Sequence, residues 1–269
     1  IFYFVFVRIL LAGLLLLAFN AVTHKLVGIR KKDLPWFLLL AFCEPFIYFL
    51  FETYGIKMTG SPTLSSMTIA TIPIFSIFAG VVFFREKINF VNIIGIFLSL
   101  GGIILVAMAK GELGEHFIVG VVFLLIAVIA EVCHASITKK LSDRYASQNI
   151  VMYQFLIGSV FLLPLFIFKG IEEFDADVYL SWDTWRPILC LAVLCSSVAF
   201  SLWVGTIKKL GVAKSSIFTA LIPVASAIIA WSCGHELLNL RQWIGVAICT
   251  VGVIMSQVTV KARDKKAVQ

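Results

Sequence analysis

Charged side chains are scarce in this sequence. Only 14% of its 269 residues are Asp, Glu, Lys or Arg, whereas 61% belong to the hydrophobic set and the mean hydropathy is +1.02. A soluble domain of this length carries about 25% charged residues. No water-soluble fold of this size could bury so much apolar surface, so the composition excludes one.

Signatures of catalysis and of metal binding are also missing. The sequence contains no H-E-x-x-H zinc motif and no G-x-S-x-G nucleophile elbow, and its six cysteines include no C-x-x-C pair. We therefore expect no enzyme activity, no cofactor and no metal site. The net charge of +7 comes from short loops rather than from one basic patch, so no nucleic-acid partner is expected either.

What the sequence does contain is a series of long apolar runs separated by short polar loops. A bilayer core about 30 Å thick is crossed by a helix of about 20 apolar residues. The runs therefore predict an all-α integral membrane protein with nine transmembrane helices. We expect these at Phe2–Ala21, Trp36–Tyr54, Ser61–Phe84, Phe90–Met108, Phe117–Ile137, Ile150–Phe168, Trp185–Thr206, Ser215–Cys233 and Leu240–Val258.

The loops between these runs alternate in charge. Most of the 22 Lys and Arg residues fall on one side, in the segments 25–32, 85–87, 139–144, 208–214 and 261–266. Because cytoplasmic loops are enriched in Lys and Arg, this side is predicted to be cytoplasmic. The chain is thus expected to be a multi-pass protein of the inner or plasma membrane, with a cytoplasmic basic tail at 261–269.

The sequence also repeats itself. Shifting it by 150 residues pairs several distinctive residues, including Gly55 with Gly205, Pro73 with Pro223 and Glu86 with Glu236. The charge pattern places Glu86 and Glu236 on opposite sides, which predicts two inverted repeats of the kind that rock about a central site in secondary transporters. We expect a first repeat at 1–112 that lacks its first helix and a second at 113–260. The intact protein should then have ten helices, five in each repeat.

Several of the paired segments resemble a known family. Glu52-Thr-Tyr-Gly-Ile-Lys, Ile69-Ala-Thr-Ile-Pro73 and Arg85-Glu86-Lys87 resemble the first EamA-type repeat of the drug/metabolite transporter superfamily, and Ala220-Leu-Ile-Pro223 with His235-Glu236 resembles the second. The resemblance implies a ten-helix transporter, often an exporter of amino acids or other metabolites. Nucleotide-sugar and sugar-phosphate exchangers belong to the same superfamily and remain the alternative.

The expected partners follow from this assignment. They are a small-molecule solute moved by alternating access, membrane lipid and protons as the coupling ion, with the protein a monomer or a homodimer. An intramembrane enzyme or a non-transporting receptor is the alternative from another class. Neither would require inverted symmetry.

Glu131 is the most informative side chain, because it lies about 9 Å inside its predicted helix. A carboxylate at that depth costs several kcal/mol unless it is protonated, paired or hydrated. His134 follows at i+3 and shares its face. The pair is predicted either to exchange a proton for solute or to form a structural pair within the bundle.

Glu44 precedes Pro45, whose ring frees a backbone carbonyl and loosens the helix, as at many transport sites. The alternative is a packing kink. Arg8 is predicted either to clamp an anionic group of the solute or to neutralise Glu44 or Glu52.

Hydroxyl groups recur at equivalent positions of the two repeats. Ser65 and Thr68 in the first, with Ser215 and Thr219 in the second, predict a polar lining of the cavity or hydrogen bonds between helices. Pro73 and Pro223 are expected to bend both helices. The further candidates for the cavity wall are Gln154, Tyr48 and Trp203, each alternatively a packing or interfacial residue.

Small residues form a matching stripe on two helices. Gly95 and Gly102 recur as Gly245 and Gly252 at the same spacing. Glycines on one face let helix backbones approach closely. We therefore expect these two helices to pack as scaffold rather than to contact solute.

Overall fold

The computed structural model describes residues 2–77, 90–109, 116–170, 181–210, 215–234 and 237–256. These residues form helices and loops, with no strand among them. Six helical segments in the described part are long and apolar enough to cross a membrane, and three apolar helices are shorter, at Pro62–Ile77, Phe218–Ser232 and Leu240–Ser256. An all-helical integral membrane protein is thus confirmed. The predicted tail at 261–269 lies outside the described residues.

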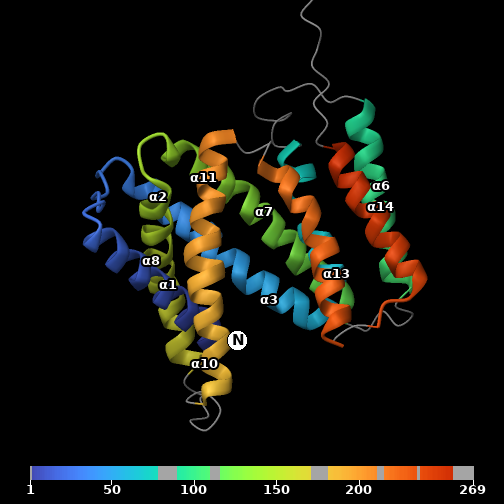
Figure 1. Cartoon of the computed structure of the whole chain (residues 1–269), viewed down its shortest axis with the longest axis horizontal. Helices are drawn as coiled ribbons and strands as arrows, with labels where there is room; N and C mark the ends of the chain where they lie inside the picture. Colours follow the sequence, from blue (N-terminus) through green and yellow to red (C-terminus); the bar gives the residue numbers. More distant parts are fainter. Residues whose placement is uncertain are drawn as a thin grey trace, which may run out of the picture. The chain divides into compact units, whose positions relative to one another are not determined.

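The chain folds as two compact units, each assembled from both halves of the sequence (Figure 1). Unit 1 comprises Ile1–Gly60 and His116–Ser215, and unit 2 comprises Ser61–Glu115 and Ser216–Gln269. Each unit therefore takes helices from both predicted repeats, and the repeat boundaries at 112 and 113 stay a prediction.

Unit 1 contains the longer apolar segments. Its elements in chain order are α1 (Phe2–Val22), α2 (Leu34–Ala41), the π-helix η1 (Phe42–Ile47), α3 (Tyr48–Thr59), α7 (Phe117–Ser142), α8 (Ser147–Leu165), the π-helix η2 (Phe166–Gly170), α10 (Trp182–Cys190), the π-helix η3 (Leu191–Ala199) and α11 (Phe200–Leu210). Within this unit α3 packs along α7 and α1 packs along α8. The core between them is closed by large, fully buried side chains such as Phe37, Leu124 and Phe155.

One segment of unit 1, predicted as the helix Trp36–Tyr54 loosened or kinked at Pro45, is a broken helix. The backbone of Glu44 is extended, with φ −146° and ψ 124°, and it separates α2 from α3 within a single apolar segment, Leu34–Thr59. Pro45 supplies the local reason, since it has no N–H to donate and its ring disfavours the helical conformation of the preceding residue. The break places the Glu44 side chain at 2% exposure.

Unit 2 is built on one tight helix pair. Its elements are α4 (Pro62–Ile69), α6 (Phe90–Ala109), the 3₁₀ helix η4 (Ser216–Leu221), α13 (Ile222–Ser232) and α14 (Leu240–Ser256). The α6 and α14 helices lie side by side (Figure 1). A Cβ atom placed on Gly102 would lie 2.6 Å from the backbone nitrogen of Cys249, and one on Gly252 would lie 2.3 Å from that of Ser99. The glycine stripe thus sits where the two backbones meet.

Local sequence signals set several helix ends. Ser61 caps α4 by accepting a 3.1 Å hydrogen bond from the Leu64 backbone N–H, and Pro62 occupies the first turn, where its missing N–H costs nothing. Gly60 ends α3 with a left-handed backbone, φ 58°. In contrast, α7 runs to Ser142 rather than ending at the predicted Ile137. Apolar character alone cannot locate that end, because the helix continues past the apolar run.

Candidate functional site

Three ionisable side chains meet inside unit 1. Glu44 comes from the break between α2 and α3, and Glu131 and His134 come from one face of α7. All three are buried, with exposed fractions of 2%, 7% and 0%. We call these three residues the acid–histidine cluster. Its members were predicted singly or as the i+3 pair, and the structure joins Glu44 to that pair.

The cluster converges on one atom of the histidine. Nδ1 of His134 lies 2.9 Å from Oε2 of Glu44 and 3.0 Å from Oε2 of Glu131. Both contacts are short, yet none of these three atoms makes a well-directed hydrogen bond within the described part of the chain. The contacts are therefore electrostatic, with two carboxylate oxygens facing one ring nitrogen.

The other ring nitrogen of His134 is held by neutral groups. Nε2 lies 3.2 Å from Oε1 of Gln154 on α8 and 3.3 Å from Oγ1 of Thr138, one turn further along α7. Gln154 and Thr138 are both fully buried. A ring fixed at Nε2 cannot rotate freely, so Nδ1 stays directed at the two carboxylates.

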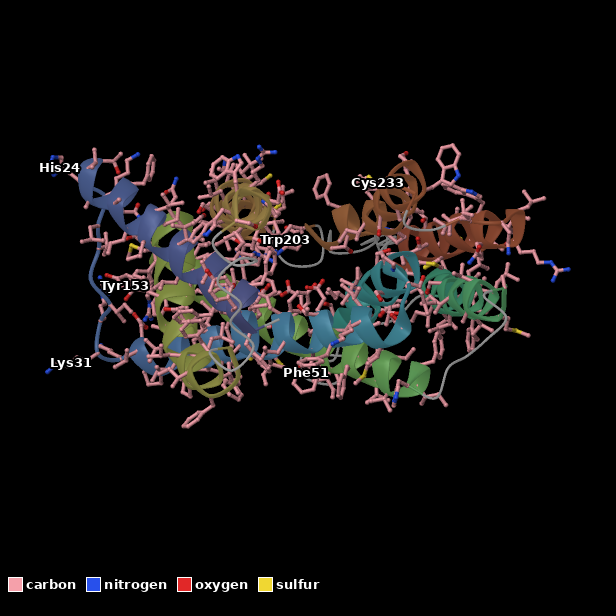
Figure 2. The ribbon with its side chains drawn as sticks, turned by 90° about the horizontal axis from the view of Figure 1, so that it is seen from below. His24, Lys31, Phe51, Tyr153, Trp203 and Cys233 are labelled. Atoms are coloured by element: carbon pink, nitrogen blue, oxygen red, sulfur yellow. The ribbon has the colours of Figure 1, made fainter. Side chains whose placement is uncertain are left out.

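The aromatic residues of α11 border the cluster. Phe200 packs against the His134 ring at a centroid distance of 6.3 Å. Trp203, labelled in Figure 2, is half-buried and lies near Glu131. Of the predicted wall residues, Gln154 and Trp203 thus belong to the surroundings of the cluster.

Arg8 on α1 forms a separate polar contact in unit 1. Its Nε donates a 2.9 Å hydrogen bond to Oγ of Ser196 on η3, and its guanidinium lies 4.5 Å from the centre of the Phe49 ring. Among the described residues it forms no ion pair with Glu44 or Glu52, although both carboxylates attract it electrostatically. Glu52 instead accepts a 3.0 Å hydrogen bond from the predicted wall residue Tyr48.

The predicted polar stripe belongs mostly to unit 2. Ser65, Thr68 and Thr219 are buried there, and Thr68 donates to the backbone oxygen of Leu64 on its own helix. Ser215 is buried at the end of unit 1.

The two predicted bends also lie in unit 2 and occupy corresponding places. Pro223 lies in the first turn of α13, directly after the 3₁₀ helix η4. Pro73 lies at the start of the helical stretch 72–77, directly after a turn at 70–71. In both segments a proline therefore starts a new helical piece, in the first turn, where its missing N–H costs no hydrogen bond.

Sequence reasoning missed several residues that support these contacts. Thr138 carried a usable signal, since it lies at i+4 from His134 and so shares its face. Ser196 and Phe49 carried none, because their proximity to Arg8 depends on how α1, α3 and η3 pack.

Unit 1 has an apolar surface groove whose lining is separate from the acid–histidine cluster. The groove has a volume of about 340 Å³ and is lined by Leu15, Leu16, Phe19, Gln148, Val193, Ser197, Val198, Ser201 and Leu202. Its lining is almost entirely apolar and contains no member of the cluster. We therefore do not assign the solute to this groove.

Comparison with known proteins identifies the class to which this fold and site belong. The EamA-like transporter family matches residues 1–108 and 118–257, which is nearly the whole chain. The chain belongs to this family, and the resemblance drawn from its motifs is confirmed. It is a multi-pass membrane transporter rather than an enzyme, and its partners are a small-molecule solute and membrane lipid.

Individual relatives of this chain are also named as transporters. The "Uncharacterized transporter YetK" of Bacillus subtilis (strain 168) is 29% identical over 264 residues, covering 96% of this chain and 78% of that protein. The "Probable terminal-alkyne amino-acid exporter" of Streptantibioticus cattleyicolor is 27% identical over 238 residues, covering 88% of this chain and 78% of that protein. A solved structure titled "Crystal structure of protein" superposes with a TM-score of 0.72 at 14% identity, covering 98% of this chain and 89% of that one, which supports the fold alone.

Solute identity, proton coupling, oligomeric state, the nine-helix count and the roles of the individual site residues stay predictions.

Proposed function

We propose that this protein is a secondary transporter that exports small metabolites such as amino acids by alternating access between two inverted repeats. The family assignment supports transport, and one relative bears the name of an amino-acid exporter. On this proposal the protein lies in the inner or plasma membrane with a cytoplasmic C-terminus. The alternative solutes are sugar phosphates and nucleotide sugars.

The observation that carries the proposal is the presence of opposite charges within apolar helices of unit 1. The acid–histidine cluster presents two carboxylates, and Arg8 presents a guanidinium that forms no ion pair among the described residues. Ionisable groups inside membrane helices are costly and are typical of solute and ion pathways. A guanidinium can bind a carboxylate, so Arg8 fits the acidic end of an amino acid.

Replacing Glu131 by Gln is expected to reduce export of the transported solute at least tenfold. The amide keeps the shape of the side chain but removes one of the two buried negative charges. Efflux of radiolabelled amino acids, sugar phosphates and nucleotide sugars from proteoliposomes containing purified protein would measure the effect. Cys133→Ser is the matched control, because Cys133 lies on the same helix with an exposed side chain. Equal efflux by wild type and Glu131→Gln would contradict a role for the cluster, and no efflux of any solute would contradict export.

The orientation can be tested with two exposed lysines that shortly follow the repeat-related Gly55 and Gly205. Lys57 and Lys209 are each replaced by Cys in a cysteine-free protein and labelled in intact cells with a membrane-impermeant maleimide. We expect labelling of Lys57→Cys from outside and of Lys209→Cys only after the membrane is opened. Labelling of both from the same side would overturn the inverted topology.

A further inference from the structure

We propose that the acid–histidine cluster binds one divalent first-row transition-metal ion, through Oε2 of Glu44, Oε2 of Glu131 and Nδ1 of His134. Each of the three buried residues offers one ligand atom, and these atoms lie within 4.8 Å of one another. This inference goes beyond the proposed function, and it departs from the expectation of no metal drawn from the sequence. Carboxylate oxygen and imidazole nitrogen together suit ions such as Mn²⁺, Fe²⁺, Co²⁺ and Zn²⁺.

The unsatisfied atoms of the cluster are the first argument. All three proposed ligand atoms are shielded from solvent, and none has a directed hydrogen bond among the described residues. Buried polar atoms are normally paired, so three that converge on one point call for a common partner. A cation placed among them would satisfy all three at once.

The orientation of His134 is the second argument. In the tautomer whose Nε2–H donates to Oε1 of Gln154, Nδ1 carries a lone pair that faces two carboxylate oxygens. Three electron-rich atoms in contact repel one another unless a positive charge lies between them. A metal-bound histidine almost always donates its second N–H to an oxygen in this way, which makes Gln154 the positioning residue.

Distance and charge agree with a metal. Two ligands at a right angle, each about 2.1 Å from a metal, are about 3.0 Å apart. The observed nitrogen–oxygen distances are 2.9 Å and 3.0 Å. Two carboxylates and a neutral imidazole carry a charge of about −2, which one divalent ion neutralises, and neutrality lowers the cost of burying the group. The ion would join the extended backbone at Glu44 to α7.

The test is equilibrium binding of Co²⁺ to the purified, EDTA-treated chain in detergent after removal of any polyhistidine tag. We expect saturable binding of one Co²⁺ per chain, a visible absorption band and a rise in Tm with Co²⁺ concentration. Glu131→Gln and Glu44→Gln should each weaken binding more than about 100-fold, and Gln154→Leu about 10- to 100-fold. Glu52→Gln, a carboxyl outside the cluster, should bind as wild type does.

Two results would overturn the metal site. One is the absence of saturable Co²⁺ and Mn²⁺ binding to wild type at micromolar protein, which would leave a cluster that holds only protons. The other is equal binding by wild type and the folded cluster variants, with folding checked by circular dichroism and gel filtration. The binding measurement on wild type tests the metal site by itself. The proposal can therefore be overturned even if a variant fails to fold. Binding is measured without transport, so its failure is distinct from failure of the exporter assignment.

Discussion

Valine at position 102 is expected to disrupt the α6–α14 pair and to lower the free energy of unfolding of unit 2 by about 3 kcal/mol or more. A Cβ on Gly102 would lie 2.6 Å from both the Cys249 nitrogen and the Gly245 oxygen. Both are backbone atoms within helical contacts, so they cannot move aside as the end of a flexible side chain can. The helices must separate, and the other close contacts along their shared face are lost with them.

Gly101→Val is the matched control for this prediction. Gly101 precedes Gly102 on the same helix, but a Cβ there meets no atom within 4 Å. Valine at this position also has a better helix propensity than glycine, so stability should be unchanged or slightly higher. Chemical unfolding in detergent, followed by circular dichroism, compares the two variants with wild type. Similar unfolding midpoints for Gly101→Val and Gly102→Val would show that the glycine contact does not hold the pair together.

Leucine at position 134 is expected to lower the stability of unit 1 by about 3–5 kcal/mol when measured in EDTA. The substitution keeps an apolar side chain of similar volume in the site. Among the described residues, it removes the one basic group in contact with the carboxylates of Glu44 and Glu131, which lie 2.9 Å and 3.0 Å from it. Two buried carboxylates are then left without a compensating charge. Removing one partner of a buried ion pair is strongly destabilising for this reason.

A second substitution separates this electrostatic cost from simple loss of packing. Adding Glu44→Gln to His134→Leu removes one of the two remaining acids, so the double variant should recover part of the lost stability. The control is His116→Leu, at the exposed histidine that directly precedes α7. This variant should unfold as wild type does. Unfolding midpoints of the four proteins in one detergent give the comparison. If the double variant is less stable than His134→Leu alone, the loss arises from packing rather than from unpaired charge.

Much of the helical architecture could be predicted because the signal is local. Apolar runs of about 20 residues fix where helices lie, and the i+3 spacing places Glu131 and His134 on one face whatever surrounds them. The loosened helix at Pro45 was predicted for the same reason, since proline acts on its own turn. Helix ends were less accurate, as at Ser142, because a helix can continue beyond its apolar stretch.

The assembly of the site could not be predicted in this way. Glu44 reaches His134 only because the break after α2 packs against α7, a contact between distant parts of the sequence. Arg8 was expected either to bind solute or to neutralise Glu44 or Glu52, yet Ser196 and Phe49 are its contacts. Both outcomes depend on packing among several helices, which no single stretch of sequence encodes.

The extended backbone at Glu44 changes how that segment can respond to force. A continuous helix from Leu34 to Thr59 would tilt as one rigid rod, whereas α2 and α3 are two rods joined near a single residue. The joint bears a carboxyl group, so whatever neutralises or grips that group acts directly on the angle between the rods. A chemical change at this one buried carboxyl group can therefore move the two distant ends of the segment.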